Sequence, residues 1–163
     1  MADRTVVGIR VALGLLAAIA LEIGVWASLA PRSFFDGFPG FGRAWVAADG
    51  PFNEHLVRDV GQLYLALGII TAAALVRPSV WIIRAVAAAW LVEGVLHFVY
   101  HADHADLYGT ADRVLNIVGL GLAVVLAALA LVLSGRLRTR RLRPPPLVSS
   151  SDPPIASSSG PRQ

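Results

Sequence analysis

Four apolar runs dominate this sequence, and each is long enough to cross a lipid bilayer as a helix. They cover about residues 6–30, 55–76, 80–101 and 112–133. A span of roughly twenty residues at about 1.5 Å per residue matches the hydrocarbon core of a bilayer. The hydrophobic fraction of 56% also exceeds that of a typical soluble domain. We therefore expect an all-α integral membrane protein, folded as an antiparallel up-down-up-down four-helix bundle.

The first apolar run also has features of a signal peptide, because Ser28-Leu29-Ala30 has small residues at its first and last positions, as a cleavage site would. Its length, the mid-span Glu22 and the proline directly after the expected cut favour an uncleaved transmembrane helix. We expect residues 1–135 to form one transmembrane domain.

The arginines predict the orientation of the chain. They flank the start of the first helix, the turn at residues 77–79 and the end of the fourth helix, which all lie on one side of a four-span protein. The other side mixes arginines with many aspartates and glutamates. The positive-inside rule therefore predicts that both termini are cytoplasmic.

The chain changes character after about residue 135. Residues 136–143 are mainly arginine, and residues 144–163 are rich in proline and serine. Such a composition buries too little apolar surface to fold, so residues 136–163 are expected to form a disordered cytoplasmic tail. Its basic part should lie against anionic lipid headgroups, and nothing indicates nucleic acid as a partner.

Residues 31–54, between the first two apolar runs, are rich in glycine, proline and aromatic side chains. Aromatic residues often anchor a chain at the depth of the lipid headgroups. Long loops also act as lids or binding loops. We favour the interfacial anchor, with a lid over the polar residues described next as the alternative.

The third apolar run carries a polar stripe. Glu93, His97, His101 and His104 recur at intervals that place them within about 80° of one another on a helix. The second run begins with another polar group, after a candidate N-cap at Asn53. Since the second helix starts on the non-cytoplasmic side and the third ends there, we expect the two groups to lie side by side. The residues of the second group are Glu54, His55, Arg58, Asp59 and Gln62.

Two carboxyl groups lie deeper in the membrane. Glu22 and Glu93 are each about 12 Å below the expected outer end of their helix. Charged groups at that depth are costly and usually face the bundle interior. A proton could pass outward from Glu93 to His97, one turn away.

Three interpretations of these polar residues remain open: a metal site, a metal-free polar pocket or proton path, and a structural network around Arg58 and Arg113. Imidazole and carboxylate ligands suit zinc, iron or copper, and the absence of cysteine excludes thiolate ligands. The candidate metal ligands are His97, His101, His104 and His55, and the candidate binding residues are Glu54, His55, Arg58, Asp59, Gln62, Glu22 and Glu93.

The leading functional hypothesis is a small-ligand or metal-binding membrane protein whose site faces the non-cytoplasmic side. The alternative is a non-enzymatic accessory subunit that packs against a larger redox or transport complex in the membrane. An enzyme is less favoured, because the chain has no Walker loop, G-x-S-x-G or H-E-x-x-H motif. No catalytic residue is assigned.

Residues 38–61, with their Asn-Glu-His and Arg-Asp strings, resemble a group of four-helix membrane proteins from high-GC actinobacteria. The alanine-rich, lysine-free composition is similar. The architecture of residues 6–134 also resembles the DoxX-like families of small bacterial membrane proteins. These resemblances imply a location in the bacterial plasma membrane and an accessory role in membrane redox chemistry, but they imply no particular site residue.

Overall fold

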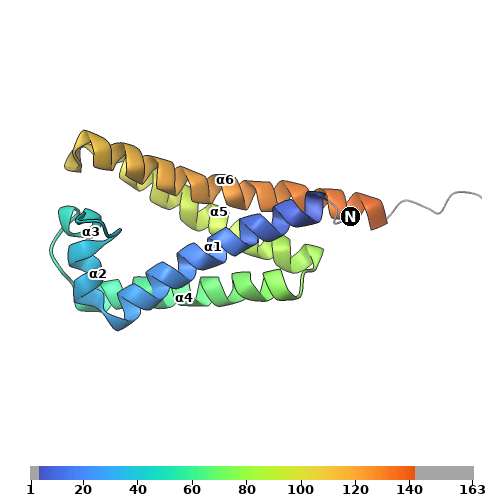
Figure 1. Ribbon diagram of the computed structural model, residues 1–163, viewed down its shortest axis with the longest axis horizontal. Helices are drawn as coiled ribbons and strands as arrows, with labels where there is room; N and C mark the ends of the chain where they lie inside the picture. Colours follow the sequence, from blue (N-terminus) through green and yellow to red (C-terminus); the bar gives the residue numbers. More distant parts are fainter. Residues whose placement is uncertain (1–3, 142–163) are drawn as a thin grey trace, which may run out of the picture.

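The computed structural model describes residues 4–141, and the surroundings of side chains for residues 4–137. Four long helices make up most of this part of the chain (Figure 1). Each is long and apolar enough to cross a membrane, so the prediction of an all-helical chain with four such segments is confirmed. They are α1 (Arg4–Leu29), α4 (Glu54–Val76), α5 (Val80–Asp103) and α6 (Thr110–Arg141).

Three short helices lie in the connections. Two of them, α2 (Pro31–Gly37) and α3 (Trp45–Ala48), occupy the segment between α1 and α4 that was expected to be a loop. A proline at the first position favours α2, since its missing N–H is not needed there. A single 3₁₀ turn, η1 (Ala105–Leu107), joins α5 to α6.

The two ends of the molecule differ in what they contain. The start of α1, the α4–α5 turn and the end of α6 lie together, and we name this the tail end (Figure 1). Helices α2 and α3 and the α5–α6 connection lie at the opposite end, which we name the loop end. Helix α1 packs along α4 and α5 packs along α6, while α1 also crosses α6. Figure 1 shows the two helix pairs separating toward the loop end.

A single apolar core fills the tail-end half of the molecule. Small alanines alternate in it with larger side chains, as close helix packing in membranes requires. Trp90 is its largest fully buried side chain, and its indole Nε1 donates a hydrogen bond to Thr71 Oγ1 at 3.0 Å. The buried members are Ile9, Ala12, Leu13, Leu16, Ala20, Ala74, Ile83, Val86, Ala87, Trp90, Leu126, Ala127, Ala130 and Leu133.

Glycines bring the backbones of α1 and α4 together nearer the loop end. A Cβ atom added to Gly61 would lie 2.6 Å from the backbone nitrogen of Ser28, and one added to Gly24 would lie 2.7 Å from that of Leu65. No side chain fits at either contact. The pair is therefore held by direct backbone approach, a common device in membrane helices.

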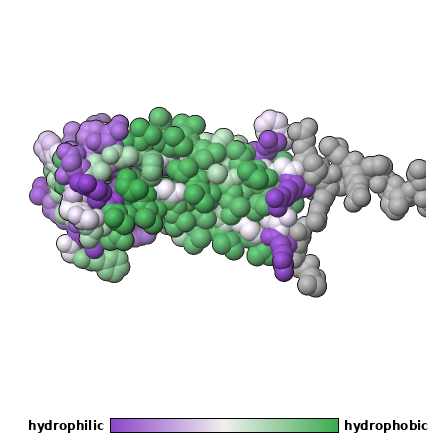
Figure 2. Space-filling model, turned by 90° about the horizontal axis from the view of Figure 1, so that it is seen from above, coloured by the Kyte–Doolittle hydropathy of each residue, from purple (hydrophilic) through white to green (hydrophobic). Residues whose placement is uncertain are grey.

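The surface matches a position within a bilayer. Figure 2 shows a broad hydrophobic band around the middle of the molecule, with hydrophilic residues at both ends. Large apolar side chains such as Leu63, Leu96 and Val125 are more than half exposed in this band. A water-soluble protein rarely exposes such a continuous apolar surface.

Helix α6 continues past its predicted end near residue 133. It runs to Arg141, so residues 136–141 are helical rather than the start of a disordered tail. Leucine and arginine are both good helix formers, and the first proline comes only at residue 144. The rest of the predicted tail, residues 142–163, lies outside the described residues.

Candidate functional site

A group of three polar side chains lies about midway along the helices, between α4 and α5. The Tyr64 hydroxyl donates a hydrogen bond to Glu93 Oε1 at 2.5 Å, and His97 Nδ1 lies 2.9 Å from the same oxygen. Tyr64 Oη is also 3.5 Å from His97 Nδ1. Both partners therefore converge on one carboxylate oxygen, which reduces the cost of holding Glu93 at this depth. We name these three residues the Glu93 triad.

Polar groups continue from the Glu93 triad toward the loop end. The rings of His97 and His101 are in contact, with centroids 4.8 Å apart. His101 Nδ1 lies 3.3 Å from the hydroxyl of Tyr108, which donates to the backbone oxygen of Trp45 at 3.3 Å. Burial, with a smaller contribution from the nearby Asp49 carboxylate, raises the pKa of Tyr108 to about 12. Its hydroxyl is therefore protonated at neutral pH and can both donate and accept.

The segment between α1 and α4 joins the two helix pairs at the loop end. On one side, Phe34 and Phe35 of α2 are buried with Ala27 of α1 and Val57 of α4. This contact is apolar and fixes α2 on the α1/α4 pair.

On the other side, α3 and its flanks make polar contacts with α5 and α6. Trp45 Nε1 donates to Asp112 Oδ1 at 2.9 Å, and the Arg43 guanidinium pairs with the same oxygen. The Tyr100 hydroxyl donates to Asp49 Oδ1 at 3.1 Å. The segment also accepts a hydrogen bond from Tyr108, the neighbour of His101, at the backbone oxygen of Trp45. Its aromatic residues pack on the molecule, except Phe41, which is 99% exposed.

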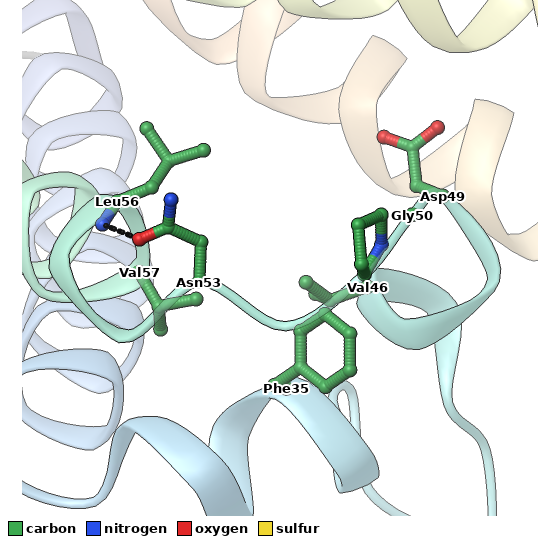
Figure 3. A pocket seen from close by; sticks show the side chains of 8 residues that line it. Phe35, Val46, Asp49, Gly50, Asn53, Leu56 and Val57 are labelled. Atoms are coloured by element: carbon green, nitrogen blue, oxygen red, sulfur yellow. Dashed lines mark hydrogen bonds between the residues drawn. The ribbon is translucent and has the colours of Figure 1, made fainter.

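A small pocket lies beneath this segment, next to the start of α4 (Figure 3). Its volume is about 140 Å³, and apolar side chains form most of its wall. Asn53 lines it, but the Asn53 side chain accepts a hydrogen bond from Leu56 N at 3.1 Å, as predicted for an N-cap. The pocket shares no residue with the Glu93 triad.

The polar start of α4 does not join the histidines of α5, contrary to expectation. Arg58 donates to Glu54 Oε1 and to the backbone oxygen of Ser28 in α1. His55 Nε2 lies 3.4 Å from Asp59 Oδ2, and the His55 side chain is 87% exposed. The reason is that the Gly61 face of α4 packs on α1, which turns these residues away from α5.

The four histidines do not converge. His104 stacks on Tyr100 at 4.3 Å and its Nδ1 lies 2.8 Å from the Tyr100 carbonyl oxygen. Within residues 4–137, no group of three histidine, aspartate or glutamate side chains is arranged to hold a metal ion. The proposed set of His97, His101, His104 and His55 therefore has no common centre in this part of the chain.

Glu22 and Gln62 lie on the surface. The expectation that Glu22 faces the bundle interior is wrong, since it is exposed on α1. Gln62 is exposed on α4. Neither side chain has a hydrogen-bond or ion-pair partner among the described residues.

Two members of the site were not predicted, Tyr64 and Tyr108. Tyr64 could have been found by depth, because it lies ten residues after the start of α4 and Glu93 lies ten residues before the end of α5. Both are therefore about 15 Å from the loop end. Nothing in the sequence distinguishes Tyr108 from other aromatic residues near a helix end.

Comparison with protein-family models, with curated proteins and with solved structures gives no match. The class that the fold itself defines is an all-helical protein with four apolar helices of membrane-spanning length. The resemblance to DoxX-like families stays a prediction.

Proposed function

We propose that this chain is a multi-pass protein of the bacterial plasma membrane, an up-down-up-down bundle with both termini in the cytoplasm. The arginine distribution supports this orientation, since Arg4, Arg10, Arg77 and Arg84 all belong to the tail end. The hydrophilic residues at both ends of the hydrophobic band fit a molecule of this length across a bilayer (Figure 2). The loop end then faces the extracytoplasmic side.

The function we propose is proton binding at Glu93 from the extracytoplasmic side. The observation that carries it is the Glu93 triad itself: a carboxylate at mid-span, held by a phenol and an imidazole. Ionisable groups at this depth mark proton relays and ligand sites more often than packing. From the Glu93 triad, polar side chains continue toward the loop end through His101 and Tyr108, whereas the tail-end half holds the apolar core. Protons would therefore enter and leave on one side.

The proposed path uses groups whose chemistry suits proton transfer. His101 exchanges a proton with the loop end through the Tyr108 hydroxyl, 3.3 Å away. His97 receives a proton on one ring nitrogen and gives the proton on its Nδ1 to Glu93. The His97 and His101 rings touch without a direct hydrogen bond in the described residues, so a ring rotation or one water molecule would complete the step.

The metal hypothesis has less support than this one. Zinc, iron and copper sites in proteins draw their ligands to one point, and the histidines here are spread along α5 and α4. A small polar ligand that binds at the Glu93 triad stays compatible with the proton proposal, because both need the same three side chains.

Infrared difference spectroscopy of the protein in lipid nanodiscs tests the proposal. We expect a carboxyl band that appears and disappears with pH in the wild type and is lost in Glu93→Gln. Glu54→Gln is the matched control, since Glu54 lies at the helix start and pairs with Arg58. Its spectrum should keep the band.

A second variant tests the path. His101→Phe should keep the band but slow its exchange on transfer to deuterated buffer. A Glu93→Gln spectrum identical to the wild type at every pH would refute proton binding at Glu93. Unchanged exchange in His101→Phe would refute the route through His101.

A further inference from the structure

The exposed side of the α1/α4 pair carries two polar side chains at one depth in the membrane. Glu22 lies seven residues before the end of α1, and Gln62 lies eight residues after the start of α4. Both are therefore about 11 Å below the loop end. Both are exposed and have no partner among the described side chains. Lipid offers neither group a hydrogen bond, so each is costly where it stands.

The two side chains flank the same side of the pair. Helices α1 and α4 touch through Gly24 and Gly61 and run in opposite directions. In an antiparallel pair, the residue directly after the contact residue points to the same side of the pair on both helices. Val25, which follows Gly24, and Gln62, which follows Gly61, therefore lie on one side. Glu22 lies at the edge of this side, about 160° around α1 from Gly24.

This side is turned away from the rest of the molecule. Tyr64, which reaches Glu93 on α5, lies about 160° around α4 from Gln62. The positions one turn deeper than Glu22 and Gln62 are Ala18 and Ala66, both exposed. Such small residues allow another helix to approach closely.

We propose that this side, defined by Glu22, Ala18, Gln62 and Ala66, binds a second copy of this chain in the membrane. A two-fold axis along the membrane normal keeps every residue at its own depth. Glu22 of one copy then faces Gln62 of the other, and the reverse pair forms at the same time. In each pair the Gln62 amide donates to the Glu22 carboxyl group, so both costly groups leave the lipid together. This symmetry needs a matched acceptor and donor at one depth, which the sequence supplies.

Cysteine cross-linking tests the arrangement directly, because the natural chain contains no cysteine. Copies with Ala18→Cys and copies with Ala66→Cys, each with its own tag, are reconstituted together in liposomes and oxidised. We expect cross-links between the two kinds of copy. The matched control pairs Ala18→Cys with Ala89→Cys, an exposed alanine on α5, and should give none.

Removal of the polar pair tests its chemistry. Glu22→Leu and Gln62→Leu should each weaken dimerisation about tenfold, because each variant breaks two hydrogen bonds between copies. Glu22→Gln should keep most of the affinity, since an amide can replace the carboxyl group as acceptor.

Three results would overturn the proposal. The first is equal cross-linking with the Ala89→Cys control, and the second is a monomer in single-molecule photobleaching at every protein density. The third is cross-linking in native membranes to other proteins alone. None of these outcomes changes the result for proton binding at Glu93, because Glu93 lies between α4 and α5 and is tested by infrared spectroscopy.

Discussion

The two halves of the molecule use the same four helices in different ways. In the tail-end half, α1, α4, α5 and α6 enclose one apolar core, whose largest fully buried side chain is Trp90. In the loop-end half, the two helix pairs separate (Figure 1), and the segment between α1 and α4 connects them. Its contacts are apolar on the α1/α4 side and polar on the α5/α6 side.

Because of this difference, the tail-end half stabilises the fold and the loop-end half holds the candidate site. The apolar core holds the helices together mainly through complementary shapes, with the Trp90–Thr71 hydrogen bond inside it. The loop-end half can then place a carboxylate, two imidazoles and two phenols between separated helices. We expect substitutions in the core to affect stability most, and those in the loop-end half to affect local order.

The largest effect should come from Trp90→Ala. Trp90 is 1% exposed, and its loss leaves a cavity and removes the hydrogen bond that its indole donates to Thr71 Oγ1. We expect a loss of about 3 kcal/mol or more in the free energy of unfolding. Unfolding in mixed detergent micelles, followed by circular dichroism, measures it. Trp81→Ala is the matched control, since Trp81 is 86% exposed on the same helix and should change little.

Gly61→Ala should come next. The added methyl group would meet the backbone of Ser28 at 2.6 Å, and backbone atoms cannot move aside alone. We expect a loss of about 2 kcal/mol in the same unfolding measurement. Gly119→Ala, where no atom lies within 4 Å of the added carbon, should be neutral or slightly stabilising. Equal stability of the two variants would contradict the close contact of α1 with α4.

A smaller effect is expected from Asp112→Ala, which removes the acceptor of both Trp45 and Arg43. The loss of stability should be smaller than for Gly61→Ala, because these groups are partly exposed. Amide hydrogen exchange should rise in residues 40–50 but stay unchanged in the tail-end core. Asp36→Ala, which breaks the exposed pair with Arg32, serves as the control. If Asp112→Ala changed the exchange rates equally in residues 40–50 and in the tail-end core, the order of the segment would not depend on Asp112.

The smallest effect concerns Tyr108 and high pH. The folded protein raises the pKa of Tyr108 from 10.0 to about 12, so it holds the proton more tightly than the unfolded chain does. This contribution to stability is complete below pH 10 and is lost as the pH rises through about 12. Stability measured between these values should fall less steeply in Tyr108→Phe than in the wild type. Parallel curves would show that burial does not protect this phenol.

The sequence alone determined the helices and the depth of the polar residues. The four apolar runs predicted α1, α4, α5 and α6, because only a helix satisfies the backbone of such a segment in lipid. The spacing of Glu93, His97 and His101 placed them on one face, and Asn53 marked the start of α4. These features depend on residues near one another in the chain.

Only the tertiary structure decided which faces meet. The polar start of α4 was expected beside the histidines of α5. Instead, Arg58 contacts α1 at Ser28 while His55 is exposed, and Tyr64 is the α4 residue that reaches Glu93. The rotation of α4 is fixed by the contact of Gly61 with α1, which belongs to a distant segment. Helical periodicity gives the angle between residues on one helix, but only packing against the other helices sets the direction in which that helix points.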